Sequence, residues 1–348
     1  MDLSTRYLGL SLANPIVASA SPLSHTVEGV RRLADGGVGA VVLHSLFEEE
    51  LDEEAERIAR LAEAGSESFA ESLSYFPGVV GTSGGPGPGP GPGPDGGAAY
   101  YLSLLERASA AVDIPVIASL NGVTPGGWTG HARRMQEAGA AALELNLHAP
   151  PAVPGAPSAD VEARHVEILG RVRAAVTIPV AVKLSPYYTS VGEMAVRCRD
   201  AGADGLVLFN RFLHPDVDPE AVRVVPAVGL SHPSEGRLPR TWIALLRNRI
   251  AIDLAGSTGV EGVEDVAGYL LAGADVVMTT SALLRHGPGH ARVLIDGLVS
   301  WMERKGFRSL GELRGVLAVP ADGDATRRAR ADYVAALRAA NANLRGPW

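Results

Sequence analysis

Cysteine is nearly missing from this chain of 348 residues, in which Cys198 is the only one. A single cysteine excludes a disulfide within the chain, and it excludes a four-cysteine zinc or iron–sulfur centre supplied by this chain alone. An excess of positive charge is missing as well, since 31 Lys and Arg residues oppose 39 Asp and Glu residues. The net charge of −8 argues against a nucleic-acid-binding protein, whose phosphate contacts need a basic surface.

Long apolar runs are also missing. No stretch approaches the roughly 18 uninterrupted apolar residues that a membrane-spanning helix needs. The segment from Met1 to Arg6 lacks the basic region and apolar core of a signal peptide. We therefore expect a cytoplasmic protein with neither a membrane nor a nucleic acid as its partner, and we identify no metal site.

The sequence does contain a repeated unit. A helical segment ends in a turn that contains glycine, and an apolar run follows at once, as glycine is suited to turning the chain back after a helix. The unit recurs at 35–43, 137–145, 200–209 and 271–278. The apolar runs predict eight strands near residues 15–19, 40–45, 115–121, 142–147, 179–185, 205–210, 251–257 and 275–281.

Eight apolar strands that alternate with helices are typical of a parallel sheet. Eight such units in one chain favour a single closed (βα)8 TIM barrel, which is an α/β fold. A doubly wound open sheet is the alternative. Its usual Gly-x-Gly-x-x-Gly after the first strand is replaced here by Ala-Ser-Ala-Ser-Pro at 18–22.

Three segments interrupt the alternation of strands and helices. Residues 83–97 alternate Pro and Gly, which predicts a surface loop without a core. Residues 212–240 form an insertion between strands six and seven, which we expect over the barrel mouth. We predict a barrel domain over 1–317 and a tail over 318–348, in which 325–340 has helical spacing and a packing or oligomer role.

Polar side chains end several of the apolar strands. Lys183 ends the run Pro-Val-Ala-Val-Lys, and a lysine is rarely buried unless it is paired, so it reaches either solvent or an anion. Asn121, Asn146 and Asn210 end three other strands, and in a barrel all strand ends converge on one face. Amides that donate and accept, beside one cation, suit a flat heterocycle that becomes anionic. Alternatively, each Asn only caps a strand or turn.

The loops after strands seven and eight favour a phosphate. Residues 255–260 and 279–282 are small, and they precede helices expected to begin near Gly262 and Leu283. Backbone N–H groups beside helix N-termini bind phosphate, and barrels commonly hold phosphate at these two loops.

A phosphate site and an amide-lined pocket together suggest FMN across the barrel mouth. Lys183 beside the N1–C2=O edge of the flavin would stabilise the reduced anionic ring. A Schiff-base enzyme that uses Lys183 on a phosphorylated substrate is a competing interpretation. A catalytically silent flavin-binding protein is another.

Short motifs throughout the chain resemble those of dihydroorotate dehydrogenases. The similarity covers most of residues 5–317, and the sequence is most similar to the bacterial dihydroorotate dehydrogenase-like proteins. The motifs are Leu-Gly-Leu at 8–10, Ala-Asn-Pro at 13–15, Leu-Asn-Leu at 145–147, Val-Lys-Leu-Ser-Pro at 182–186, Leu-Phe-Asn-Arg-Phe at 208–212, Ser-Thr-Gly-Val at 257–260 and Gly-Phe-Arg-Ser-Leu at 306–310.

This resemblance implies an FMN-dependent oxidoreductase that converts dihydroorotate to orotate in pyrimidine biosynthesis. It also implies a homodimer, a small-molecule substrate and, because this chain cannot build an iron–sulfur relay, a separate electron-acceptor protein. Asn146 and Asn210 would contact the substrate. The implied FMN contacts are Ala18, Ser19, Ser45, Asn121, Asn146, Lys183, Thr258, Gly259, Thr280 and Ser281.

The sequence departs from the family where the substrate reacts. The family's catalytic loop carries a Cys or Ser base, and Ala149 stands at that position and cannot take a proton. Pro151 replaces a substrate asparagine, and another appears lost in 72–75. His44 matches a second lysine of the family and is a candidate contact, while His148 is the candidate replacement base because histidine titrates near neutrality. We expect a retained flavin site with weak or no activity on dihydroorotate.

Overall fold

The computed structural model describes residues 1–48, 97–122, 128–147, 155–211, 216–225, 229–322 and 324–343. Among the predicted features, His148, Ala149, Pro151, residues 72–75 and most of the Pro/Gly tract lie outside these ranges. Within them, no helix is both long and apolar enough to cross a lipid bilayer, and no group of three or more His, Cys, Asp or Glu side chains could hold a metal ion.

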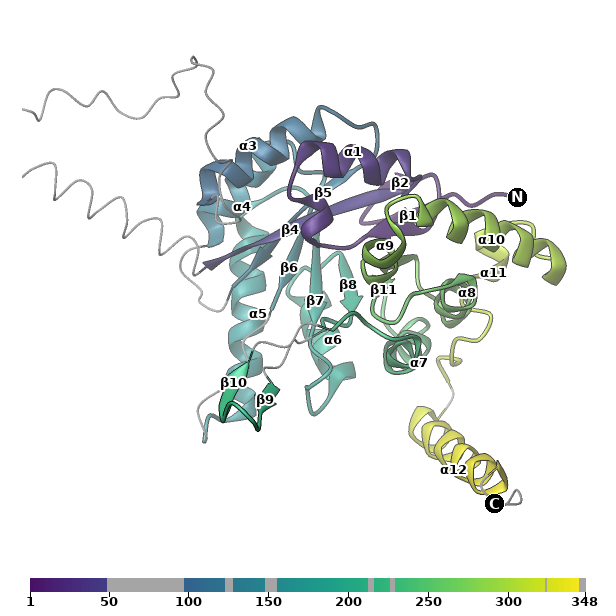
Figure 1. The fold of residues 1–348 in the computed structure, drawn as a ribbon. Coiled ribbons are helices and arrows are strands. Elements are labelled where there is room, and N and C mark those ends of the chain that lie inside the picture. Colours follow the sequence, from purple (N-terminus) through teal and green to yellow (C-terminus); the bar gives the residue numbers. More distant parts are fainter. Residues whose placement is uncertain are drawn as a thin grey trace, which may run out of the picture.

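Eight parallel strands close into a barrel, with β12 paired back to β3 (Figure 1). This closure confirms the predicted (βα)8 fold and excludes the open doubly wound sheet. All eight expected strands are present: β4 extends two residues beyond its predicted end, and the other seven lie within their predicted ranges and are slightly shorter. They are β3 (Ile16–Ala18), β4 (Ala40–Phe47), β5 (Val116–Asn121), β6 (Ala142–Asn146), β7 (Val180–Leu184), β8 (Gly205–Leu208), β11 (Asp253–Gly256) and β12 (Val276–Thr279).

Helices cover the outside of the barrel, and local sequence signals explain their ends. The Thr26 and Ser190 side chains accept hydrogen bonds from the first turns of α1 and α6. Gly273 ends α8 with φ +119°, a left-handed conformation that glycine adopts without strain. The helices are α1 (Val27–Asp35), α3 (Gly97–Ser109), α4 (Trp128–Glu137), α5 (Ser158–Ala175), α6 (Val191–Asp200), α7 (Arg237–Leu246), α8 (Val263–Ala272), α9 (Ser281–His286), α10 (His290–Lys305) and α11 (Leu310–Leu313).

A short hairpin closes the N-terminal end of the barrel. Strands β1 (Thr5–Tyr7) and β2 (Leu10–Leu12) pair antiparallel. Tyr7, Leu8 and Leu12 are almost completely buried, and they belong to one apolar cluster with the inward side chains of the barrel strands. The hairpin therefore fills the barrel at its N-terminal end, and the C-terminal end is left as the open face.

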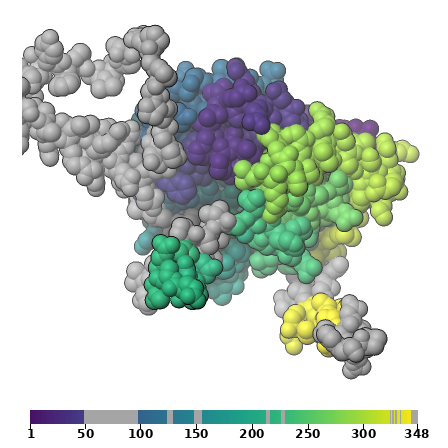
Figure 2. All heavy atoms as spheres, viewed as in Figure 1, coloured from purple at the N-terminus to yellow at the C-terminus, as the bar shows by residue number. Residues whose placement is uncertain are grey.

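The insertion after β8 contains a second hairpin, β9 (Asp216–Asp218) with β10 (Arg223–Val225), followed by the short helix η3 (Pro233–Gly236). Because η3 leads directly into α7, the end of the predicted 212–240 insertion is already the next barrel helix. The tail contains the predicted helix, α12 (Ala325–Asn343). Figure 2 shows the green β9–β10 hairpin and the yellow α12 projecting from the body of the molecule.

A buried carboxylate ties the last strands to the C-terminal segment. Asp275, at 2% exposure, accepts hydrogen bonds from Arg247 Nη1 at 2.8 Å, Arg314 Nη1 at 2.9 Å and the backbone N–H of Leu254 at 2.8 Å. Arg314 also donates to Thr5 Oγ1 at 2.6 Å. One anion thus joins β11, β12, the N-terminal hairpin and the chain after α11.

Replacing Asp275 with Ala should lower the free energy of unfolding by about 3 kcal/mol, because it leaves two partly buried guanidinium groups without their anion. Urea unfolding would measure the change. The control is Glu167→Ala, which removes an exposed pair with Arg171 on α5 and should cost less than about 0.5 kcal/mol. Equal effects of the two substitutions would contradict this account of the Asp275 cluster.

Candidate active site

Hydroxyl and amide side chains meet at the C-terminal ends of four strands. Ser45 Oγ lies 2.8 Å from Ser119 Oγ, and Asn146 Nδ2 donates to Ser45 Oγ at 2.9 Å. Asn210 Nδ2 lies 3.5 Å from Asn146 Oδ1. A register shift in β4 between Val42 and Ser45 places Ser45 opposite Ser119. The mouth network is our name for two hydrogen-bonded groups at these strand ends: Ser45, Ser119, Asn146 and Asn210 form one, and Ser19, Glu144 and Lys183 form the other.

Lys183 is the cation of the mouth network and is only 7% exposed. Its Nζ lies 3.2 Å from Glu144 Oε1 and 3.3 Å from Ser19 Oγ. The sequence predicted that Lys183 reaches either solvent or an anion, and the structure gives it an anion from the chain itself. Sequence reasoning missed Glu144, although it lies two residues before Asn146 and must therefore share its face of the strand.

Three of the predicted cofactor contacts lie at one level on neighbouring strands. The register pairs Asn121 with Asn146, and Asn146 with Lys183. Ala18 is buried at the end of β3, directly before Ser19. Direct hydrogen bonds join the predicted Ser45, Asn146 and Asn210 with the unpredicted Ser119, and they join the predicted Ser19 and Lys183 with the unpredicted Glu144.

The loop after β11 has an unusual backbone that Tyr269 supports. Thr258 has φ +80° and Gly259 has φ +67°. The Tyr269 hydroxyl donates to the carbonyls of Ser257 and Thr258 at 2.8 and 2.6 Å. A Cβ at Gly259 would lie 2.5 Å from the backbone nitrogen of Gly236, so only glycine fits this close approach to η3.

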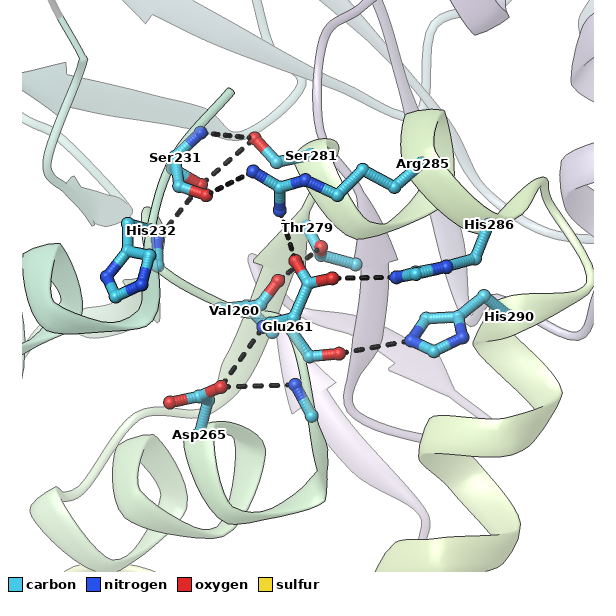
Figure 3. Close-up of polar contacts among 12 residues, drawn as sticks. Ser231, His232, Val260, Glu261, Asp265, Thr279, Ser281, Arg285, His286 and His290 are labelled. Atoms are coloured by element: carbon cyan, nitrogen blue, oxygen red, sulfur yellow. Dashed lines mark hydrogen bonds and ion pairs between the residues drawn. The ribbon is translucent and has the colours of Figure 1, made fainter. Parts of the chain in front are cut away.

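Ser231 joins the two predicted phosphate loops (Figure 3). Its N–H and hydroxyl both reach Ser281 Oγ at 2.9 Å, and its Oγ accepts from the Gly259 N–H at 3.3 Å. Arg285 donates to the Ser231 carbonyl at 2.8 Å and also pairs with Glu261. Thr280 Oγ1 donates to the Ser19 carbonyl at 3.1 Å, which connects these loops with the mouth network. Ser231 lies 50 residues before Ser281 and was not predicted from the sequence.

The N-terminus of α8 is already capped. The backbone N–H groups of Glu261 and Gly262 both donate to Asp265 at 3.1 Å. Beside it, the Gly259 N–H donates to Ser231 Oγ, and the Ser231 N–H and hydroxyl both donate to Ser281 Oγ. An anion at these loops would therefore have to take these donors from their present acceptors.

His44 occupies a different environment from the mouth network. Its ring centroid lies 4.0 Å from that of His25 and 5.0 Å from that of Tyr101, which belongs to α3. Burial, and to a smaller extent the neighbouring His25, lowers the pKa of His44 to about 4. At neutral pH, His44 is thus an uncharged ring packed against aromatic neighbours, unlike the lysine that the family has there.

A cleft adjoins Asn210 on the same face of the barrel. It has a volume of about 400 Å3, within the size range of small-molecule sites. Arg211 lines it and pairs with Glu235 at 2.8 Å between Nε and Oε2. Its other lining residues come from the β7, β8 and β11 ends and from η3 and α7: Pro186, Tyr187, Phe209, Asn210, Ser234, Arg237, Leu238, Pro239 and Thr258.

The chemistry of these donors fits FMN. Lys183 has three N–H groups, of which Glu144 and Ser19 accept two, and the amides of Asn121 and Asn146 offer both donors and acceptors to a ring with carbonyls and nitrogens. At the loops proposed for the phosphate, Gly259 lets the backbone pass close to that of η3. The loop there is small and carries backbone N–H groups, which suit a phosphate. The two ends are continuous through Thr280 and Ser19.

The low pKa of His44 predicts a specific acid sensitivity. In the unfolded chain, His44 has a pKa near 6.5 and is protonated below that pH. In the folded protein it is protonated only near pH 4. Its contribution to stability, at most about 3 kcal/mol, is therefore present above pH 6.5 and lost as the pH falls to 4. Urea unfolding at several pH values should show a steeper acid decline for the wild type than for His44→Gln. Parallel declines of the two proteins would show that folded and unfolded His44 bind a proton at the same pH, which would contradict the lowered pKa.

Comparisons with known proteins identify the family to which this chain is similar. The family model described as dihydroorotate dehydrogenase matches residues 91–302, more than half of the chain. The catalytic subunit of dihydroorotate dehydrogenase B (NAD(+)) from Methanothermobacter thermautotrophicus is 26% identical over 325 residues, which cover 90% of this chain and 98% of the relative. The protein of the same name from Geotalea uraniireducens is 27% identical over 322 residues, covering 91% and 98%.

A relative that is named for a different activity also aligns with most of this chain. The chloroplastic dihydropyrimidine dehydrogenase (NADP(+)) from Arabidopsis thaliana is 25% identical over 334 residues, which cover 90% of this chain and 76% of the relative. These relatives are dehydrogenases, and the resemblance found in the sequence motifs is confirmed. The chain belongs to the dihydroorotate dehydrogenase family of oxidoreductases.

Proposed function

We propose that this protein is an FMN-dependent oxidoreductase that acts on the CH–CH bond of a small cyclic substrate related to dihydroorotate. The observation that carries the proposal is a buried lysine ammonium among hydroxyls and amides at the open end of the barrel. Bound FMN supplies the hydride acceptor. The residues that would hold its ring are Ala18, Ser19, Ser45, Asn121, Asn146 and Lys183, and those near its phosphate are Thr258, Gly259, Thr280 and Ser281.

Lys183 supports a redox function better than a Schiff-base function. A Schiff-base lysine attacks a carbonyl as a neutral amine, so its surroundings must favour loss of the proton. Lys183 instead has the Glu144 carboxylate as its ion-pair partner at 3.2 Å. A cation held in this way suits the oxygen and nitrogen edge of a flavin, which becomes negative when the ring is reduced.

The substrate half of the site differs from the flavin half. Ala149 stands where the family has its base, and a placed base contributes on the order of 10²–10⁴-fold to the rate. We propose that oxidation of dihydroorotate is correspondingly slow, that His148 is the candidate base, and that the preferred substrate enters beside Asn146 and Asn210. A cleft of about 400 Å3 adjoins Asn210, and its lining includes neither Asn146 nor Lys183.

The electron acceptor is proposed to be a separate protein. Two of the relatives are named catalytic subunits of an NAD(+)-dependent dehydrogenase. This chain has one cysteine, Cys198, which lies buried in α6 with its thiol pKa raised to about 12 by burial. A thiol of this kind does not take part in electron transfer. Cytoplasmic location, a homodimer and a role in pyrimidine metabolism remain part of the proposal.

Absorption spectroscopy and a substrate panel test this proposal. The purified protein, or the protein reconstituted with FMN, should show flavin bands in the near-UV and blue. Under anaerobic conditions one of a panel of dihydropyrimidines and dihydroorotate should bleach the band, with dihydroorotate at least about 100-fold slower than in a family member that has the Cys or Ser base.

Two variants sharpen this test. Lys183→Met should slow bleaching by any substrate, whereas Arg171→Met on the exposed face of α5 should not change it. Dihydroorotate turnover equal to that of an authentic family member, and lost in His148→Ala, would refute the weak activity and identify His148 as the base. A protein that takes up no FMN would refute the proposed function as a whole.

A further inference from the structure

We propose that Glu144 is a positioning residue of the flavin site: it fixes the Lys183 ammonium at the barrel mouth and offsets its charge, so that it tunes how strongly the flavin accepts negative charge. This inference rests on the proposed function. It assigns a role to a strand residue inside the barrel, one pleat below the mouth.

The strand pattern places Glu144 inside the barrel. Along β6, Ala142, Glu144 and Asn146 share one face, because successive side chains of a strand alternate. Ala142 belongs to the apolar cluster in the barrel interior, and Asn146 belongs to the mouth network. Glu144 lies between them with 1% exposure, at the boundary between the apolar filling and the polar mouth.

The Glu144 carboxylate is directed at Lys183. Oε1 accepts from Lys183 Nζ at 3.2 Å, whereas Oε2 is among the buried polar atoms of the described residues that have no hydrogen-bond partner. A carboxylate that served only to fill space would need its second oxygen satisfied, since a buried polar atom without a partner costs about 1–3 kcal/mol. The ion pair with Lys183 is therefore the contact that offsets the cost of burying this carboxylate.

The hydroxyl of Tyr7 is another such atom in the barrel interior. Burial raises the pKa of Tyr7 well above its usual value, and the charge of Glu144 raises it further. The tyrosine therefore stays neutral and adds no second negative charge beside Glu144. Lys183 is the cation that pairs with Glu144, and the pair presents almost no net charge to a ligand at the mouth.

Removal of the carboxylate charge should expose the charge of the lysine. Glu144→Gln keeps the size of the side chain and an oxygen that can still accept from Lys183, so the ammonium stays in place without its anion. A unit charge a few ångströms from the ring changes the stability of a negatively charged flavin by about tenfold or more at the effective dielectric constant of a partly buried site. For a two-electron couple, tenfold corresponds to about 30 mV.

Sulfite binding to the oxidised flavin measures this effect without turnover. Sulfite adds to the ring and leaves a negative charge on it, so its affinity reports positive charge nearby. With FMN-loaded protein, Glu144→Gln should bind sulfite at least about tenfold more tightly, and its midpoint potential should rise. Lys183→Met should bind sulfite at least about tenfold more weakly.

Three further variants separate positioning from packing. Glu144→Asp keeps the charge and should stay within about threefold of the wild type, which also provides a folded comparison if the Gln variant is unstable. Glu144→Gln combined with Lys183→Met removes both charges and should bring the sulfite affinity back toward that of the wild type, above that of Lys183→Met alone. Glu167→Gln removes an equal charge from the exposed face of α5 and should have no effect.

Unchanged sulfite affinity in Glu144→Gln, with FMN bound, would overturn this inference and leave the proposed function standing. So would a Glu144→Asp variant as strongly altered as the Gln variant, since that result would indicate packing and not charge. Absence of bound FMN in the wild-type protein would overturn both this inference and the proposed function, and this outcome is visible before any variant is made.

Discussion

A buried ammonium and a buried carboxylate, 3.2 Å apart, are the interaction on which the open end of this barrel depends. Neither charge could lie alone in an apolar interior, because transfer of an isolated ion from water costs more than the net stability of a protein. The direct pairing of β6 with β7 sets the register that places Asn146 beside Lys183. The Ser19 hydroxyl is the other side chain that Lys183 contacts.

The arrangement divides the barrel into an end that confers stability and an end that carries chemistry. At the N-terminal end, the β1–β2 hairpin fills the barrel, and Asp275 holds strands and C-terminal segment together. At the C-terminal end, Thr280 and Ser231 link the small loops after β11 and β12 to each other and to the mouth network. A cofactor with a polar ring and a phosphate would span these connected parts, while the loop at Ala149 decides which substrate reacts.

The fold was readable from the sequence because its signals are local and repeated. Each strand is a short apolar run, four of the runs follow a glycine turn, and eight such runs leave few alternatives to a closed barrel. The strand ends predicted most of the mouth network for the same reason, since parallel strands in a barrel all end on one face. The sequence pattern alone therefore groups Lys183, Asn146 and Asn210 together.

Tertiary structure decided which partners these residues have. Glu144 was hidden in a run that resembles any buried strand, and its pairing with Lys183 follows from the register of β6 against β7. Ser231 meets Ser281 across 50 residues, a contact that only the folded insertion creates. The irregularity in β4 turns Ser45 toward the mouth, while the His44 ring packs on His25 and Tyr101. The sequence by itself determined the barrel and the lysine at its mouth; the pairing of β6 with β7 supplied the anion, because the register of two strands decides which of their side chains lie within reach of an ion pair.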